Sequence, residues 1–199
     1  MGKVVGIDLA GSEKRDTGFC VLDAQMGCST AVIHTDAEIL RETLATRPDV
    51  VSIDAPLFLP RGRVSLEVKG PPHFRECDRE LLRMHIKFFP ISLGPMRMLT
   101  ARGMKLRASF EVRGLEVIES FPGAIQDILG IPRKQAGLQA LESGLVREGV
   151  RWKEPEASRT GDELDAVTSA LVGLMYVRNE YRAIGDPDEG LMILPMPRT

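Results

Sequence analysis

The chain has 199 residues, of which 43% are hydrophobic and 27% are charged, and its formal net charge is −2. These values are typical of a globular protein with one core, and a net negative charge argues against non-specific binding to nucleic acid. No apolar run approaches the roughly 20 residues of a membrane span. The N-terminus lacks the apolar segment of a signal peptide, and the three cysteines (Cys20, Cys28 and Cys77) lack metal-binding spacing. We therefore expect a reduced, cytoplasmic setting and no membrane partner.

The first third of the chain has strand patterns and one helix pattern. Alternating apolar residues predict three strands with short links, which favours an antiparallel meander, at residues 3–10, 17–23 and 29–34. Asp36 is a plausible N-cap residue for a helix that runs to about Thr46. The stretch DVVSIDAP, residues 49–56, then predicts a fourth strand. A strand after a helical crossover is expected to lie parallel to its partner, here the first strand.

The rest of the chain is richer in helix patterns. An insertion at about residues 58–113 begins as a loop rich in Gly and Pro and continues with two predicted helices, residues 74–89 and 96–111. After it we expect a fifth strand and a helix that starts at Pro122. An amphipathic helix follows, and its inner face carries Leu138, Leu141, Leu145 and Val146. The last predicted elements are a long apolar helix over residues 162–182 and a short edge strand at residues 190–197. This order predicts a single α/β domain, residues 1–199. Its mixed five-stranded sheet would be an antiparallel meander plus parallel strands, flanked by helices.

The predicted insertion is strongly basic. Residues 61–113 carry twelve Arg and Lys against five Asp and Glu, a net charge of +7 that leaves −9 on the remainder. One interpretation is a localised surface that binds anions, and Arg75 and Arg79 are candidate contacts for a substrate phosphate. The other interpretation is an exposed helical face whose basic residues pair with nearby acids. The sequence leaves both open.

Five acidic residues stand in or at the ends of predicted elements. Asp8 lies in the first strand, Asp54 ends the fourth and Glu119 ends the fifth, whereas Asp162 and Asp165 open the long apolar helix. Crowded carboxylates do not all stay ionised without a cation, and Mg²⁺ or Mn²⁺ suits oxygen ligands of this kind. Two such ions can activate a water molecule and stabilise the leaving oxygen in phosphodiester cleavage.

Each acid also has a simpler explanation. Asp162 could be a helix N-cap residue, with Asp165 as a partner in a capping box. Asp54 could open a turn before Pro56, and Glu119 could end a strand at the surface. Asp8 is harder to explain in this way because Ile7 and Leu9 bracket it.

The motifs GIDLAGS, SIDAP, VIESFP and DELDAVTSAL resemble those of the predicted RNase H-like nucleases grouped as domain of unknown function 429, and the resemblance extends over nearly the whole chain. The wider superfamily includes RNase H and RuvC-type resolvases. The resemblance implies an RNase H-like fold, metal-dependent nuclease activity and divalent-metal ligands at Asp8, Asp54 and Asp165. It implies a catalytic role for Asp162 beside them. Glu119 corresponds less well, although we count it among the expected catalytic residues and ligands.

Other residues could contact a substrate. Ser12, in the turn after the first strand, could offer its hydroxyl to a phosphate, and Arg133 and Lys134 stand at a helix start. The partner expected is nucleic acid, DNA or RNA, and a homodimer is one option for the assembly. Two other functions remain open: a phosphotransferase that binds a nucleotide, and a catalytically silent binding protein on the same fold.

Overall fold

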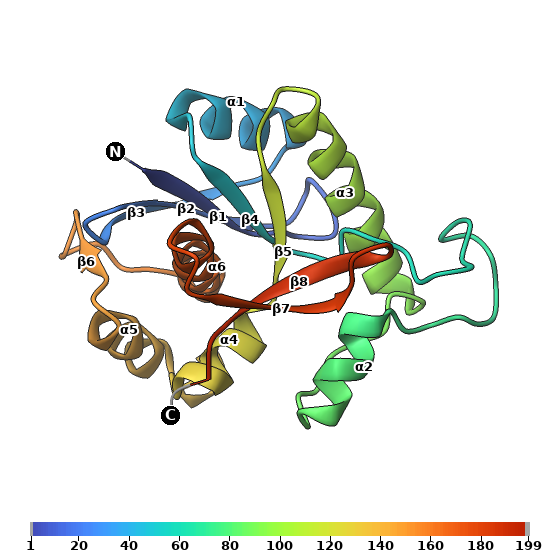
Figure 1. Cartoon of the computed structure of the whole chain (residues 1–199). Coiled ribbons are helices and arrows are strands. Elements are labelled where there is room, and N and C mark those ends of the chain that lie inside the picture. Colours follow the sequence, from blue (N-terminus) through green and yellow to red (C-terminus); the bar gives the residue numbers. More distant parts are fainter. Residues whose placement is uncertain (1, 198–199) are drawn as a thin grey trace.

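A central mixed sheet organises the protein (Figure 1). The computed structural model describes residues 2–197, and in them the strand order is β6-β3-β2-β1-β4-β5-β8-β7. The strands are β1 (Lys3–Asp8), β2 (Thr17–Asp23), β3 (Gly27–Ile33), β4 (Val50–Asp54), β5 (Val117–Ser120), β6 (Arg151–Trp152), β7 (Tyr181–Asp186) and β8 (Gly190–Pro195). The meander of β1, β2 and β3 is antiparallel, and β4 pairs in parallel with both β1 and β5. The α/β fold, the meander and the parallel strands are confirmed.

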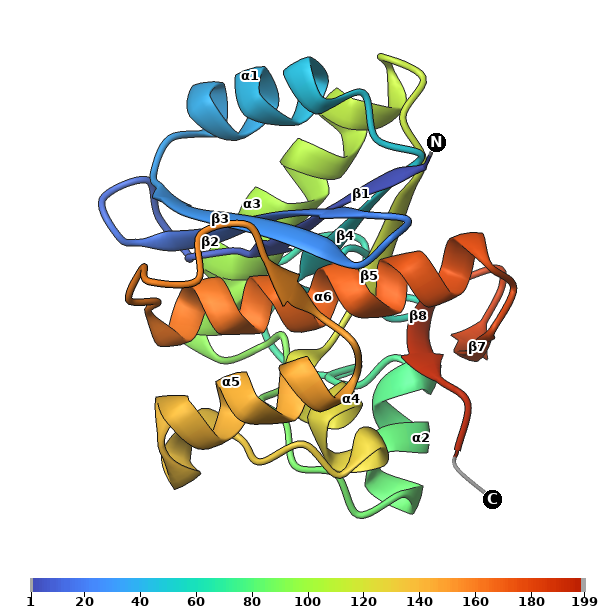
Figure 2. The same cartoon turned by 90° about the vertical axis from the view of Figure 1, so that its left-hand side faces the viewer.

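Helices cover both faces of this sheet (Figures 1 and 2). Helices α1 (Asp36–Thr46) and α3 (Gly94–Glu111) lie on one face. Helix α6 (Gly161–Val177) crosses the other face, with α4 (Pro122–Leu129) and α5 (Leu138–Arg147) beyond it. Alternation along β1 explains this division, because Val5 and Ile7 join the core under α1 and α3 whereas Val4 joins the core under α6.

Two glycines let α6 lie close to the sheet. A Cβ atom on Gly6 of β1 would overlap the backbone of Ala166 and Ala170, and one on Gly18 of β2 would overlap the backbone of Asp162. Gly18 is paired with Asp8 in the sheet. The first turn of α6 can therefore approach the end of β1, which brings the acids of this helix toward Asp8.

The sheet is larger than the five strands expected. The long helix ends at Val177, and Asn179 then turns the chain with a φ of 59°. The next residues form β7, which pairs with β8 as an antiparallel hairpin. Strand β8 also pairs with β5, so it is an inner strand and the prediction of an edge strand was wrong. The two-residue strand β6 extends the opposite edge beside β3.

Several helix boundaries also differ. The helix predicted over residues 74–89 is shorter, because α2 (Glu76–Arg83) ends before His85, which has a φ of 59°. Thr35, not Asp36, is the N-cap residue of α1, and it forms a capping box with Glu38. The amphipathic region after α4 divides into the short helix η1 (Lys134–Ala136) and α5. On α5, Leu141 and Leu145 are buried as expected, whereas Leu138 and Val146 are exposed.

The insertion is fastened to the β7–β8 hairpin. Glu189, in the hairpin turn, accepts hydrogen bonds from the backbone N–H groups of Arg61 (2.6 Å) and Glu76 (2.5 Å). The Arg61 guanidinium also donates to Asp186 at 2.6 Å. We call these contacts the clasp, because they hold both ends of the loop that precedes α2. Glu80 of α2 accepts a further hydrogen bond from the backbone N–H of Gly185.

Candidate functional site

A row of polar residues ends three parallel strands. Asp8 of β1 is paired with Asp54 of β4, and Asp54 is paired with Ser120 of β5. Because β1, β4 and β5 run in the same direction, their carboxyl ends meet at one edge of the sheet, where ligands of α/β proteins commonly bind. The predicted juxtaposition of Asp8 and Asp54 is thus present.

Helix α6 adds two more carboxylates to this edge. Thr160 caps the helix and forms a capping box with Glu163, so the alternative role of Asp162 as N-cap residue was wrong. Asp162 and Asp165 are therefore not needed to complete the cap. Asp165 is 7% exposed, whereas the side chain of Asp162 is 40% exposed. We call Asp8, Asp54, Asp162 and Asp165 the acid cluster.

The acid cluster has unusual protonation behaviour. Burial, followed by repulsion from Asp165, raises the pKa of Asp8 from 3.8 to about 7. Burial and then the charge of Asp8 raise the pKa of Asp54 well above its ordinary value. Without a metal, Asp8 and Asp54 therefore hold a proton at pH values where surface aspartates are fully ionised.

Lys134 supplies a positive charge to the acid cluster. Its Nζ lies 2.8 Å from Asp165 Oδ2 and 3.6 Å from Asp162 Oδ1. Although burial acts in the opposite direction, the hydrogen bond to Asp165 raises the pKa of Lys134 above its ordinary value. The predicted substrate contact thus lies directly on the acids, and its ammonium group occupies a position that suits a cation.

Two further residues of the site were missed from the sequence. Gln126 of α4 is 2% exposed, and its Nε2 donates to Asp165 Oδ1 at 2.7 Å and to Thr168 Oγ1 at 3.1 Å. The available signal was a glutamine among the apolar residues of the run AIQDIL, in which Asp127 is the other polar residue. Ser120 is 1% exposed, and its Oγ has no hydrogen-bond partner among the described residues. A buried hydroxyl without a partner is uncommon and marks a site that a ligand can complete.

Glu119 is held apart from the acid cluster. It is paired with Ile53 in the sheet, one residue out of step with the row of Asp8, Asp54 and Ser120, so its side chain leaves the opposite face. Its Oε2 accepts hydrogen bonds from Arg75 Nη1 and from the backbone N–H of Leu57, both at 2.7 Å. A role for Glu119 as metal ligand stays a prediction, and its observed partner is an arginine.

Arg75 is correspondingly a buried structural residue. It is 2% exposed, and it donates from Nε and Nη2 to Asp78 and from Nη1 to Glu119. Proximity to Glu119 and Asp78 raises the pKa of Arg75 well above its ordinary value, against the effect of burial. This network positions α2 against the end of β5. In this arrangement the guanidinium group is used by the protein itself, so we do not carry Arg75 forward as a phosphate contact.

Other basic residues also have internal partners. Arg79 pairs with Glu76, and Arg133 pairs with Asp127. The other predicted substrate contact, Ser12, lies in the turn after β1. Of the twelve basic residues between 61 and 113, nine donate to carboxylates or backbone carbonyls: Arg61, Arg63, Arg75, Arg79, Arg83, Arg102, Lys105, Arg107 and Arg113. Most basic residues of this segment therefore have hydrogen-bond partners within the protein.

The acid cluster meets the chemical requirements of a divalent cation. Within residues 2–197, no three His, Cys, Asp or Glu side chains already form a metal-binding group. However, Asp8, Asp54 and Asp165 offer carboxylate oxygens, the ligands that Mg²⁺ and Mn²⁺ prefer, and the Lys134 ammonium group stands in for a cation among them. These three carboxylates could bind such an ion once the Lys134 ammonium group gives up its contact with Asp165.

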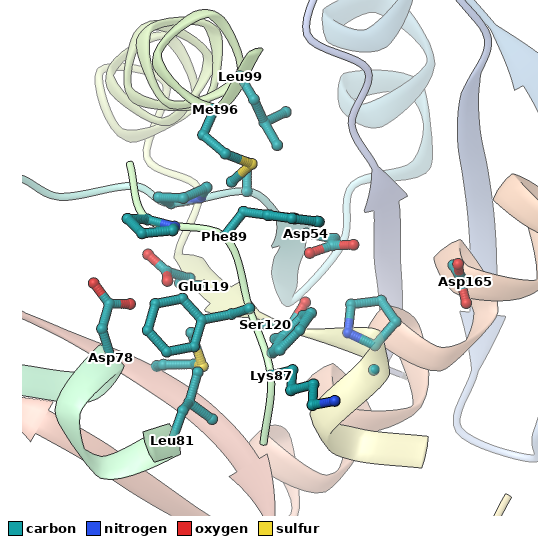
Figure 3. Close-up of a pocket in the computed structure, with 18 of the residues that line it drawn as sticks. Asp54, Asp78, Leu81, Lys87, Phe89, Met96, Leu99, Glu119, Ser120 and Asp165 are labelled. Atoms are coloured by element: carbon teal, nitrogen blue, oxygen red, sulfur yellow. The ribbon is translucent and has the colours of Figure 1, made fainter. Parts of the chain in front are cut away.

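A pocket of about 780 Å³ opens beside the acid cluster. Asp54 and Asp165 line it together with Ser120, and most of its remaining wall is apolar. In Figure 3, Phe89, Met96 and Leu99 lie on one side of the space and Leu81 on another, and the Phe89 side chain points in the direction of Asp54. None of these apolar residues was predicted to form a site.

Comparison with known proteins supports the fold. No protein-family model matches the chain, and no curated protein matches it. Solved structures with a similar fold include two of RuvC. The chain aligns with Thermus thermophilus RuvC in complex with a Holliday junction substrate at 17% identity and a TM-score of 0.51, over 96% of this chain and 100% of that chain. For another Thermus thermophilus RuvC structure the values are 16% and 0.50, over 89% and 96%. The likeness shows that the chain has a RuvC-like fold.

Proposed function

We propose that the protein is a divalent-metal-dependent nuclease that hydrolyses phosphodiester bonds. One observation carries this proposal: Asp8, Asp54 and Asp165, from two strands and one helix, converge at the carboxyl edge of the sheet beside a lysine. Two of these acids have strongly raised pKa values, which is typical of functional sites. The RuvC-like fold is consistent with this chemistry, although fold alone does not assign an activity.

The residues have separate roles in the proposed reaction. Asp8, Asp54 and Asp165 would hold Mg²⁺ or Mn²⁺, which when bound supplies an activated water and stabilises the leaving oxygen. Asp162, at the more exposed end of the acid cluster, would orient water near the metal ligands. Lys134 would exchange its contact with Asp165 for one with a phosphate oxygen of the substrate.

Nucleic acid is the proposed substrate because Lys87, Arg133 and Lys134 line the same pocket as Asp54 and Asp165. These cations can neutralise a phosphate backbone that the carboxylates alone would repel. Branched DNA is the first substrate to test, since one similar protein is described in complex with a Holliday junction. Single-stranded DNA, duplex DNA and RNA complete the panel.

Cleavage assays with Mg²⁺ and Mn²⁺ test the proposal. Asp8→Asn and Asp54→Asn should each lower the rate by a factor of about a thousand or more, since both remove a ligand. Asp49→Asn is the matched control, because Asp49 is exposed and precedes β4 at its other end. Activity of equal rate in all three variants would show that a contaminating nuclease is being measured. If no substrate in the panel is cleaved, the proposal is wrong.

A further inference from the structure

The apolar pocket has the character of a binding site for a planar ring. Its 780 Å³ volume falls within the range of small-molecule sites. Phe74 and Phe88 form part of its wall and pack edge to face, with ring centroids 5.9 Å apart. Phe89 also lines the pocket, yet this large apolar residue is 70% exposed. The exposed Phe89 ring, next to the packed rings of Phe74 and Phe88, offers a surface on which a planar ligand can stack.

The polar groups of the pocket indicate what kind of ring it accepts. Ser120 Oγ is buried and has no partner among the described residues, so a ligand edge can complete its hydrogen bonding. Asp54 and Asp165 in the same wall disfavour an anionic group inside the pocket. The cations Lys87, Arg133 and Lys134 also line it. A neutral ring with hydrogen-bonding edges, attached to a phosphate that lies beside these cations, satisfies all of these conditions.

We infer that this pocket receives one unstacked base of a nucleic-acid strand while the adjacent phosphate lies at the acid cluster. The inference rests on the proposed nuclease function and names its substrate class: strands with an unpaired or extruded nucleotide. A base inside a continuous duplex is stacked on both sides and cannot enter a pocket walled by Phe88 and Phe89. The protein should therefore prefer a bulge to the paired duplex of the same sequence.

Binding in EDTA tests the pocket separately from cleavage. The probes are a DNA duplex with one unpaired 2-aminopurine nucleotide, the fully paired duplex, and the same bulge with an abasic residue. We expect the base-containing bulge to bind about tenfold more tightly than the other two, as stacking of one base on an aromatic side chain provides. Its 2-aminopurine fluorescence should change on binding.

Phe89→Ala should reduce binding of the base-containing bulge to the level of the abasic one. Val112→Ala is the matched control, because Val112 is 85% exposed, belongs to the same insertion and does not line the pocket. The inference is wrong if the abasic bulge binds as tightly, if neither bulge binds, or if Phe89→Ala has no effect. Displacement of the probe by a free nucleoside monophosphate at equal concentration would identify a nucleotide site instead. If binding behaves as expected but no substrate is cleaved, only the proposed hydrolysis fails.

Discussion

The protonation of Asp8 should make the stability of the protein depend on pH. Its pKa is raised to about 7, so the folded state binds a proton more tightly than the unfolded state does. The free energy of unfolding of the metal-free protein should consequently decrease as the pH rises from about 4 to above 7. A divalent metal bound at the acid cluster, as we propose, would compete with protons for these carboxylates.

Asp8→Asn should remove this decrease in the free energy of unfolding with rising pH. At pH 8 the metal-free variant should be more stable than wild type by on the order of 1–3 kcal/mol, because the cost of burying the Asp8 charge and its repulsion from Asp165 are removed. Near pH 4, where Asp8 is protonated in wild type, the two proteins should be about equally stable. Chemical denaturation at both pH values measures the difference. The control Asp49→Asn changes the same charge away from the acid cluster, and a strong destabilisation specific to Asp8→Asn would assign Asp8 a structural role.

Lys134→Ala should strengthen metal binding. Without its ammonium group, Asp165 and Asp162 no longer have a competing cation, and Mn²⁺ should bind about five- to tenfold more tightly, which corresponds to about 1 kcal/mol. The metal-free variant should also be less stable, since the acids repel one another more. Calorimetric titration with Mn²⁺ measures the affinity.

Lys153→Ala is the control for this experiment, because Lys153 has similar exposure and pairs with Asp23, outside the acid cluster. Weaker Mn²⁺ binding by Lys134→Ala would mean that Lys134 orients Asp165 for the metal and does not compete with it.

At the scale of the element, the approach of α6 to the sheet decides whether the site exists. Gly18→Ala would place a Cβ atom against the backbone of Asp162 and Glu163. We expect a loss of roughly 1–3 kcal/mol of stability from overpacking. Mn²⁺ binding should weaken as well, because the first turn of α6 must move away from Asp8.

Gly94→Ala is the control, since a Cβ atom at the start of α3 meets no atom within 4 Å. Thermal unfolding and Mn²⁺ titration of both variants give the comparison. Unchanged metal affinity in Gly18→Ala would show that the position of α6 is less critical than we argue.

The sequence predicted those elements whose signals are local. Strand patterns, short links and a helical crossover sufficed for the meander and for the neighbouring Asp8 and Asp54. The face on which Glu119 projects depends on a register that shifts with a single residue, and its partner Arg75 lies 44 positions away. Strand β7 was missed because the predicted helix ran on to Arg182, into the first residues of this strand, whereas β8 was predicted as a strand but at the edge of the sheet. The apolar pocket joins segments that are distant in the sequence, so no local pattern could reveal it.

At the scale of the whole molecule, positive charge is used mainly to build the insertion. Arg102 donates to Asp36 and to the carbonyl groups of Ala10 and His34. These bonds join α3 to the segment after β1 and to the start of α1. Arg63 organises its own loop through the carbonyl groups of Gly70, Pro72 and Val68. Residues 2–197 contain no helix that is both long and apolar enough to cross a bilayer. The proposed contacts with a substrate phosphate are therefore limited to Lys87, Arg133 and Lys134, which line the pocket.

Because the clasp around Glu189 holds both ends of the loop before α2, the chain should tolerate a break in this loop. Both ends of the loop before α2 are fixed to the hairpin, and the exposed Lys69 lies between them. A cut after Lys69 would separate β1–β4 from the remaining strands, yet β4 would still pair with β5 and β1 would still pack on α6. We expect residues 1–69 and 70–199, expressed together as two polypeptides, to assemble into one complementing pair that co-elutes in size-exclusion chromatography. Glu189→Gln should weaken this pair, and separate elution of the wild-type fragments would contradict the expectation. The acid cluster would then be shared between two chains, with Asp8 and Asp54 on one and Asp165 on the other.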